Sequence, residues 1–273
     1  MSSILITGGS GFLGSGLVEK LLRSPEYNRI CIYSRSEHRQ AEMREEFGND
    51  ARLRWLIGDV RDERRLERAL HGVEDVIHAA ALKRVETGEY DPVEMFKTNL
   101  WGTESILAAA ERAYVRRIVL VSSDKAYQPV SPYGLSKAGA EALFRRHHGN
   151  LATAVVRYGN VAGSTGSVIP RWRAAKDRIV DITDPDCTRF WMWREQAVDF
   201  VLSGLLAAPC KNVMIPDLPA FRIGDLAEAM GLYARVIGLP DHEKKHESMD
   251  ATHCSETARR LTVEELRRML PHV

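Results

Sequence analysis

The chain has 273 residues and a nearly balanced charge, with 38 Lys and Arg against 37 Asp and Glu and a formal net charge of +1. At about 150 residues per domain, this length predicts one large domain or one domain with a small appendage. Hydrophobic residues make up 44% and charged residues 27%, which argues against disorder and against nucleic-acid binding driven by charge. We therefore expect small molecules or proteins as partners, and no nucleic acid.

The composition gives no sign of a membrane span, a leader or a metal site. The apolar run at 73–82 is far shorter than the roughly 20 residues that span a bilayer. The first residues lead without a basic flank into Ile4-Leu5-Ile6, which is typical of a first strand and not of a signal peptide. The cysteines lie far apart without a CxxC pair, which favours buried or incidental thiols over a disulfide framework or a zinc site. We expect a cytoplasmic protein.

Short β-branched segments alternate with amphipathic ones over the first part of the chain. The predicted strands lie at 4–7, 30–33, 53–57, 76–78, 118–122 and 154–157, and the predicted helices at 14–22, 41–47, 63–70, 93–114 and 132–146. Such a series predicts an α/β fold, a Rossmann-type doubly wound parallel sheet with helices on both faces. Functional side chains should then lie beyond the carboxyl ends of the strands.

Beyond about residue 160 the pattern loosens, and helices are predicted at 194–206, 223–236 and 263–270. We interpret this part as a small, shortened C-terminal lobe that covers the ligand crevice. The expected division is a first domain at 1–160 and a second lobe at 161–273. Because no long linker separates them, we expect the two to be interleaved in one fold unit.

A glycine-rich loop follows the first predicted strand and opens the first helix. Its sequence, Thr-Gly-Gly-Ser-Gly-Phe-Leu-Gly at 7–14, is a GxxGxxG pattern. Glycines permit a tight turn and let backbone N–H groups approach a pyrophosphate at the positive end of a helix. A turn that merely needs small residues is the alternative, but the position at the first strand-to-helix junction favours a dinucleotide. The candidate cofactor contacts here are Gly8, Ser10, Gly11, Phe12, Leu13 and Gly14.

The end of the second strand indicates which dinucleotide is bound. An enzyme that uses NAD carries an acid there for the ribose hydroxyl groups, whereas this chain has Ser34 and Arg35. A guanidinium can bind a 2′-phosphate through two hydrogen bonds, so Arg35, with Ser34 and Arg39, predicts NADP. A solvated Arg at a helix start is the alternative. After the third strand we expect Asp59 and Val60 at the adenine, although Asp59 could instead cap a helix.

Three polar residues around the fifth strand predict proton chemistry. Ser123 ends the strand, and Tyr133 and Lys137 follow in a YxxxK pattern on the next predicted helix. This spacing puts Tyr133 and Lys137 on one helix face, where the ammonium can lower the pKa of the phenol and the phenolate can exchange a proton with a substrate hydroxyl. A surface Tyr-Lys pair is the alternative, but here the pattern follows a nucleotide loop and a serine at a strand end.

Several further segments carry a family resemblance. They are Tyr-Ser-Arg at 33–35, Ile-Gly-Asp-Val-Arg-Asp at 57–62, His-Ala-Ala-Ala-Leu-Lys at 78–83, Lys-Thr-Asn at 97–99, Ser-Asp-Lys-Ala at 123–126, Arg-Tyr-Gly-Asn-Val at 157–161 and Thr-Arg-Phe-Trp at 188–191. With them, nearly the whole chain resembles the extended short-chain dehydrogenase/reductases, and most closely the inverting UDP-N-acetylglucosamine 4,6-dehydratases of the pseudaminic-acid pathway.

The resemblance implies an NADP-dependent lyase of polysaccharide biosynthesis that acts on a UDP-sugar. It makes 1–160 the NADP-binding domain, with Ala79, Ala80 and Ala81 beside the cofactor, and 161–273 the substrate-binding lobe. By resemblance, hydride leaves carbon 4 of the hexose as Tyr133 takes the hydroxyl proton, water is eliminated across carbons 5 and 6, and hydride returns to carbon 6.

The same resemblance gives Lys125 and Asp124 the elimination step. Lys125 would be the base for the proton on carbon 5 and Asp124 the acid for the departing hydroxyl, where the glucose 4,6-dehydratases carry Asp-Glu. A base must be neutral, so we expect a depressed pKa for Lys125 and a raised one for Asp124. A surface lysine in a loop is the alternative for Lys125.

The resemblance also implies contacts to the UDP-sugar. Asn160, Ser167 and Val168 would approach the substrate and its diphosphate. Arg189 would pair with the diphosphate or the uridine ribose, because arginine is always charged and binds phosphates with two hydrogen bonds.

Other candidates keep structural alternatives. Lys83 and Asn99 are expected in the active site or as braces of a helix, and 191–193, Trp-Met-Trp, is interpreted as core of the second lobe. The segment 240–247 departs from the subgroup pattern, since it has Pro-Asp-His-Glu-Lys-Lys-His-Glu in place of Arg-Pro-Gly-Glu-Lys-Leu-His-Glu. Because His242 and His246 lack a third ligand, a charged solvated loop is favoured over a metal site.

By resemblance alone we expect a homo-oligomer, a dimer formed through the helices at 93–114 and 132–146. Two rival functions stay open. A UDP-hexose epimerase or a 5,6-dehydratase of the same family would use the same first oxidation. A non-catalytic NADP-binding regulatory protein would share the fold but would not need Ser123, Tyr133 and Lys137 together.

Overall fold

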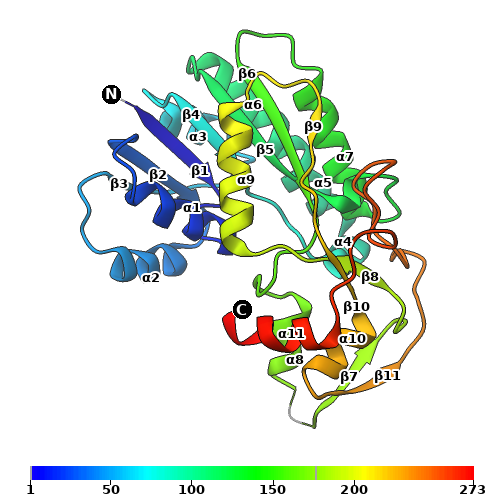
Figure 1. Cartoon of the computed structure of the whole chain (residues 1–273). Helices are drawn as coiled ribbons and strands as arrows, with labels where there is room; N and C mark the ends of the chain where they lie inside the picture. The colour runs from blue at the N-terminus through cyan, green and yellow to red at the C-terminus, as the bar shows by residue number, and fades with distance from the viewer. Residues whose placement is uncertain (1, 176) are drawn as a thin grey trace.

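The computed structural model describes residues 2–175 and 177–273, and its centre is a seven-stranded parallel sheet in the order β3-β2-β1-β4-β5-β6-β9 (Figure 1). The strands are β1 (Ser3–Thr7), β2 (Arg29–Ser34), β3 (Leu53–Ile57), β4 (Asp75–His78), β5 (Arg117–Ser123), β6 (Ala152–Tyr158) and β9 (Val213–Met214). The chain steps outward from β1 to β3 and then returns to β4 on the other side of β1. This confirms the predicted Rossmann-type order, in which a ligand crevice opens where the direction reverses.

Helices cover both faces of the sheet because successive strand residues point to opposite sides. In β1, Ile4 and Ile6 belong to the core beneath α1 (Phe12–Leu22), α2 (Glu37–Phe47) and α9 (Arg194–Leu206). Leu5, between them, belongs to the core beneath α3 (Glu63–Leu70), α6 (Gly102–Arg112) and α7 (Pro132–Arg145). Both faces are therefore buried, which explains the continuous hydrophobicity of the strands. None of the described helices has the length and apolar content needed to cross a membrane.

The helix predicted at 93–114 is interrupted in the structure. It consists of α5 (Pro92–Phe96), a π-helical turn (Lys97–Trp101) and α6, and a short helix α4 (Val85–Tyr90) precedes it. In the π-helical turn, the Asn99 amide accepts from Leu82 N and donates to Leu82 O, both at 2.8 Å, and donates to Ser136 Oγ at 3.0 Å. The wider turn thus lets Asn99 brace the segment that leaves β4.

The second lobe has its own small core. In the described part of the chain it holds α8 (Val168–Arg173), α10 (Ile223–Ala229), α11 (Val263–Met269) and two short sheets, β8 (Thr188–Phe190) with β10 (Ala220–Arg222) and β7 (Ile179–Ile182) with β11 (Tyr233–Val236). Trp172, Trp191, Phe221 and Leu266 are buried together there. In contrast, α9 and β9 leave this part of the chain and pack on the first sheet (Figure 1).

The prediction of one helix over 223–236 is wrong in its second half. Helix α10 ends at Ala229, and Gly231 follows with a φ of 65°, a left-handed conformation that ends helices. The residues of β11 then pair in parallel with β7. Tyr233 and Val236 are of the aromatic and β-branched types that favour strands. In the sequence alone, the helical spacing of the preceding residues outweighs this preference.

Candidate active site

A deep cleft opens at the carboxyl ends of the central strands, between the sheet and the second lobe. Its volume is about 1230 Å³, above the roughly 300–1,000 Å³ that is typical of a site for one small molecule. Its walls include the glycine-rich loop, the ends of β2 and β5, and residues near Asn160 and Glu247. The cleft therefore has room for a dinucleotide and a second ligand side by side.

The glycine-rich loop is shaped by close approaches that exclude side chains. Gly8 has a φ of 68°, and a Cβ on it would lie 2.9 Å from the backbone of Ala80. A Cβ on Gly14 would lie 2.6 Å from the carbonyl oxygen of Gly8, and Gly11 is the N-cap of α1. The first N–H groups of α1 are thus open to the cleft, which fits a pyrophosphate. Ser10, Phe12 and Leu13 line the same wall.

The end of β2 presents a serine and two arginines to the cleft. Ser34 Oγ accepts from Ser10 Oγ and from Gln40 Nε2, each at 2.8 Å, which leaves the proton of Ser34 for another acceptor. The side chain of Arg35 is 54% exposed, and both Arg35 and Arg39 line this end of the cleft. The structure therefore brings Ser34, Arg35 and Arg39 together.

The carboxylate of Asp59 is held by arginines. Arg61 binds it through Nε at 3.0 Å and Nη2 at 2.7 Å, and Arg35 Nη1 lies 3.8 Å from Oδ2. The alternative that Asp59 caps the following helix is wrong, because Asp62 is the N-cap of α3. Val60 is buried and lines the cleft.

The segment after β4 forms another part of the cleft wall, with Ala79, Ala80, Ala81 and Lys83. Burial lowers the pKa of the Lys83 ammonium, and the charges of Arg84 and Arg39 lower it further. Lys83 thus belongs to a group of cations at the mouth of the cleft. Asn99 has a different place: it is buried, and its amide is used on the backbone that follows β4. It acts as a brace and is not a contact residue of the cleft.

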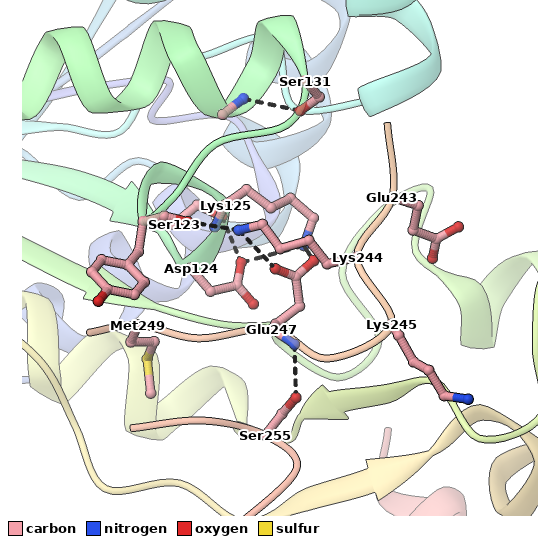
Figure 2. A network of polar contacts seen from close by, with 12 residues as sticks. Ser123, Asp124, Lys125, Ser131, Glu243, Lys244, Lys245, Glu247, Met249 and Ser255 are labelled. Carbon is pink, nitrogen blue, oxygen red and sulfur yellow. Dashed lines mark hydrogen bonds and ion pairs between the residues drawn. The ribbon is translucent and has the colours of Figure 1, made fainter. Parts of the chain in front are cut away.

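Tyr133 and Lys137 lie on one face of α7, and both line the cleft. Ser131 caps this helix, and its Oγ accepts from Gly134 N at 3.2 Å (Figure 2). A Cβ on Gly134 would lie 2.4 Å from the carbonyl oxygen of Lys125, so only glycine lets the start of α7 pack against the turn after β5. The local sequence therefore brings Tyr133 to the end of β5.

Burial changes the pKa of both groups. It lowers the pKa of Lys137 to about 8. It raises the pKa of Tyr133, and Ser123 and Lys125 offset this only in part. The expectation that the Lys137 ammonium depresses the pKa of the phenol is therefore corrected. Burial of the phenol is the largest effect, and Lys137 Nζ donates to the carbonyl oxygen of Val121 at 2.6 Å.

Asp124 and Lys125 form a 3-10 turn directly after β5, and their side chains meet that of Ser123 (Figure 2). Ser123 Oγ donates to Asp124 Oδ1 at 2.9 Å, and Lys125 Nζ donates to the same oxygen at 3.3 Å. Burial raises the pKa of Asp124, and the charge of Lys125 opposes this only in part. The raised pKa expected for Asp124 is thus found.

Lys125 departs from its predicted charge state. Burial lowers the pKa of its ammonium, but Asp124 and Glu247 outweigh burial and raise it. The predicted depressed pKa is therefore wrong for this structure, because Glu247 Oε1 lies 3.0 Å from Lys125 Nζ and two carboxyl groups favour the charged form. The alternative of a surface lysine also fails, since Lys125 lines the cleft.

Glu247 is the site residue that the sequence analysis missed. It lies in the loop after β11, its side chain is 2% exposed, and it lines the cleft beside Lys125. The surrounding charged run is typical of a solvated loop, so nothing local indicates burial. Only the resemblance of the 240–247 segment to a family motif could have marked it.

On the substrate side, Asn160 follows β6, Ser167 is the N-cap of α8 and Val168 begins that helix. All three line the cleft. Asn160 Oδ1 and Ser167 Oγ are buried and have no hydrogen-bond partner among the described residues. Because buried polar atoms are normally paired, these two fit a polar ligand in the cleft.

Arg189 lies on β8 and lines the cleft, and its guanidinium is already paired with other groups of the protein. It forms an ion pair with Glu243 and donates to the carbonyl oxygens of Thr188 at 2.8 Å and Lys245 at 3.1 Å. Burial lowers the pKa of its guanidinium, but Glu247 and Glu243 outweigh burial and raise it. A diphosphate at Arg189 stays a prediction, and such a ligand would share the guanidinium with Glu243.

The remaining candidates belong to the core or contact β8, although Trp191 also lines the cleft. Trp191 and Met192 are buried, and Trp191 packs edge to face on Trp193 at 5.5 Å and on Phe221 at 5.7 Å between ring centres. His246 hydrogen-bonds to β8. Within 2–175 and 177–273, no group of three or more His, Cys, Asp and Glu residues is placed to hold a metal ion.

A family model described as "Polysaccharide biosynthesis protein" matches residues 4–265. The chain belongs to this family. A Campylobacter jejuni (strain 81-176) relative named UDP-N-acetylglucosamine 4,6-dehydratase (inverting) is 41% identical over 257 residues, which cover 90% of this chain and 77% of the relative. A Rickettsia felis protein named UDP-glucose 4-epimerase is 38% identical over 263 residues, with the same coverage of 90% and 77%. The resemblance noted in the sequence is confirmed, and relatives of this polysaccharide biosynthesis family carry both dehydratase and epimerase names.

Solved structures confirm the fold of this family member. Pen from Bacillus thuringiensis matches with a TM-score of 0.93 and 28% identity, over 100% of this chain and 98% of that one. DesIV from Streptomyces venezuelae, a dTDP-glucose 4,6-dehydratase solved with NAD and TYD bound, matches with a TM-score of 0.83 over 98% and 96% of the two chains. At 23% identity this second likeness speaks for the fold alone.

Proposed function

We propose that the protein is a nucleotide-sugar 4,6-dehydratase that converts UDP-N-acetylglucosamine to UDP-2-acetamido-4-keto-2,6-dideoxyhexose, with inversion at carbon 5. The observation that carries the proposal is the pair of the buried Asp124 and the partly buried Lys125 beside Tyr133. An epimerase needs Tyr133 and Lys137 for oxidation at carbon 4, but it has no use for a second acid–base pair. An elimination needs a base at carbon 5 and an acid at the hydroxyl on carbon 6.

The chain's own residues divide this work. Tyr133, as a phenolate, takes the proton of the hydroxyl on carbon 4, with the buried Lys137 beside it on α7. Because burial raises the pKa of Tyr133, the phenol must lose its own proton before this step. The 4-keto group then acidifies the proton on carbon 5, which Lys125 accepts. Asp124, whose raised pKa keeps a proton available, gives that proton to the departing hydroxyl. The bound dinucleotide supplies hydride exchange with the hexose.

A nicotinamide dinucleotide fits the glycine-rich loop, and several solved structures of this fold have NAD bound. For this chain we propose NADP. Ser34 can donate its proton and Arg35 is largely exposed, so both can bind a 2′-phosphate, with Arg39 nearby. With it we propose an NADP-binding part at 1–160 and a substrate-binding part at 161–273, from which α9 and β9 return to the first sheet.

The names of the Rickettsia relatives keep UDP-hexose epimerase as the second candidate. The test is incubation with UDP-N-acetylglucosamine and NADP⁺ in deuterated water, followed by mass spectrometry and NMR. Loss of water, a 4-keto signal and deuterium at an inverted carbon 5 are expected. A product of unchanged mass would identify an epimerase.

The matching substitution is Lys125→Ala, with Lys20→Ala as a control far from the cleft. Removal of a general acid–base group should slow product formation by about 10²–10⁴-fold. The control should keep the wild-type rate. A Lys125→Ala enzyme that forms the 4-keto product at nearly the wild-type rate would remove Lys125 from the mechanism.

We further propose a dimer that works in the cytoplasm. Trp101 in the π-helical turn and Leu135 on α7 are 52% and 50% exposed, and these two elements lie side by side. Such large apolar side chains favour a partner surface.

All four cysteines are free thiols, which is typical of a reducing compartment.

A further inference from the structure

Two carboxyl groups hold the Lys125 ammonium between them. Asp124 Oδ1 lies 3.3 Å from Lys125 Nζ, and Glu247 Oε1 lies 3.0 Å from it on the other side (Figure 2). Asp124 is next to Lys125 in the chain, whereas Glu247 comes from the loop after β11. The second lobe therefore completes a cluster that begins at the end of β5.

The Glu247 loop is firmly attached at several points. Glu247 N donates to Ser255 Oγ at 2.9 Å, and Ser255 N donates to the carbonyl oxygen of Glu247 at 2.7 Å. Lys244 Nζ donates to the carbonyl oxygen of Tyr127 at 2.6 Å, close to the Asp124 turn. Two residues further along, the carbonyl oxygen of Met249 accepts from a buried arginine of β6. The position of the Glu247 carboxyl is thus fixed by the fold.

Each of the two carboxyl groups has one oxygen that accepts no hydrogen bond from the described residues. Asp124 Oδ2 and Glu247 Oε2 are buried and have no hydrogen-bond partner among the described residues, although Lys244 Nζ lies 3.7 Å from Glu247 Oε2; both residues line the cleft. A buried carboxylate oxygen without a partner is costly unless a proton or a ligand satisfies it. These oxygens can therefore take a proton without breaking an existing hydrogen bond.

We propose that Glu247 is a positioning residue that takes the proton of Lys125 across their ion pair, so that Lys125 can act as the base at carbon 5. The inference rests on the proposed dehydratase function. It assigns a role that neither the resemblance nor the relatives' names provide.

The protons balance through one cycle. Lys125 passes a proton to Glu247 and, now neutral, removes the proton on carbon 5. Asp124 gives its proton to the hydroxyl leaving carbon 6, which departs as water while the double bond forms between carbons 5 and 6. Lys125 then returns a proton to Asp124, and Glu247 returns one to Lys125. The cluster then has its starting charges again. As hydride returns to carbon 6, carbon 5 takes one proton from solvent, and Tyr133 releases to solvent the proton that it took from the hydroxyl on carbon 4.

The charges around the cluster fit this assignment. Lys125 faces Asp124, Glu247, Arg189 and Tyr133. Glu247 faces Lys125, Arg189, Lys244, Asp124 and Tyr133. Burial raises the pKa of Glu247, but the surrounding cations outweigh burial and lower it, so the resting pair is ionic. A partner within one hydrogen bond gives Lys125 access to its neutral form without exchange with water.

The test compares Glu247→Gln with Glu247→Asp and with Glu256→Gln, a control on the same part of the chain whose side chain is 62% exposed. With UDP-N-acetylglucosamine and NADP⁺, Glu247→Gln should eliminate water about 10²-fold more slowly than the wild type, with little change in KM. Oxidation at carbon 4 should continue, so the absorbance of reduced nicotinamide should accumulate. Glu256→Gln should match the wild type.

The pH profile separates a proton relay from simple structural support. Without Glu247, Lys125 must lose its proton to solvent, so the rate of Glu247→Gln should rise about tenfold per pH unit from about pH 7 to about pH 9. The wild type and Glu247→Asp, which keep a carboxylate, should lack this slope, and the ratio of the rates removes the titration of Lys137, whose pKa is about 8. A wild-type rate that climbs in the same way would overturn the relay even if no variant folds.

Two other results would also overturn the relay. One is a Glu247→Gln enzyme with wild-type turnover. The other is a slow Glu247→Gln enzyme with a flat pH profile and no accumulated reduced nicotinamide. Failure of the dehydratase proposal is distinguishable, because the wild type would then give a product of unchanged mass.

Discussion

At the scale of single residues, the imidazole of His78 lies fully buried behind the glycine-rich loop. Its Nδ1 is 2.7 Å from Thr7 Oγ1, and its Nε2 is 3.1 Å from Thr103 Oγ1. Burial, helped by the charge of Lys137, lowers the pKa of His78 to about 3. Because an unfolded histidine binds its proton near about pH 6.5, the unfolded state takes up this proton first as the pH falls. The free energy of unfolding therefore decreases as the pH falls from about 6.5 to about 3.

We predict that His78 alone costs the wild type up to about 1.4 kcal/mol per pH unit in this window. His78→Gln, which keeps polar atoms but carries no ionisable group, should lose less free energy of unfolding between about pH 6.5 and about pH 4.5. Urea denaturation of both proteins at several pH values measures the two slopes. Identical slopes would mean that the folded protein protonates His78 as readily as the unfolded chain.

The second residue-scale prediction concerns the choice of cofactor. Arg35→Ala should weaken NADP binding about tenfold or more, since a lost hydrogen bond to a charged group costs about 1.5–3 kcal/mol. The Kd for NAD should stay unchanged, because NAD has no 2′-phosphate. Calorimetric titration with both dinucleotides gives the comparison, with the exposed Arg23→Ala as control. An equal weakening for both would show that Arg35 does not distinguish the 2′-phosphate.

Single residues also show where sequence reasoning stops. Tyr133, Lys137 and the Asp124–Lys125 turn could be located because each group is set by a few neighbouring positions on one helix or one strand end. Glu247 could not, because its burial depends on a loop that crosses from the second lobe. The charge of Lys125 was predicted wrongly because Asp124 and Glu247 together keep the ammonium protonated, and only Asp124 is its neighbour in the chain.

At the scale of elements, the six predicted strands of the main sheet match β1 to β6, because continuous hydrophobic runs between helices leave few alternatives. The second lobe was harder to predict. Its strands β7, β8, β10 and β11 are short and pair in small sheets, so each depends on a partner distant in the chain. The sequence therefore predicted helix where β11 forms.

One ion pair ties three elements together and supports an element-scale prediction. Arg157 on β6 binds Glu141 on α7, and it also donates to Met249 O in the loop that carries Glu247. Arg157→Met would leave the Glu141 carboxyl buried without its cation. Removing one partner of a buried pair costs about 3–5 kcal/mol of stability.

Calorimetry should therefore show a clear drop in Tm for Arg157→Met. The matched control is Lys20→Ala, which breaks the exposed pair between α1 and Asp199 on α9. That exposed pair should contribute less than about 1 kcal/mol. Equal losses in the two variants would mean that the buried pair adds no special stability.

At the scale of the whole molecule, Trp101 and Leu135 form the expected contact between two copies. Trp101→Glu places a charge where an apolar side chain would be covered, so it should convert a dimer to a monomer. Light scattering after gel filtration measures the mass of each protein. The exposed Tyr233→Glu, on β11 at the other end of the molecule, should leave the mass unchanged. A wild type that is already monomeric would contradict the dimer.

The ion pair between Lys125 and Glu247 also sets an order of assembly. The dinucleotide loop and the Tyr133–Lys137 face are made from the first part of the chain, with α9 packed on α1 beside the loop. Glu247 is translated late, and it reaches Lys125 only after the second lobe has docked. A nascent or clipped chain could therefore hold a dinucleotide but could not expel water from a sugar. Elimination would then be the last step of the reaction to become available as the chain folds.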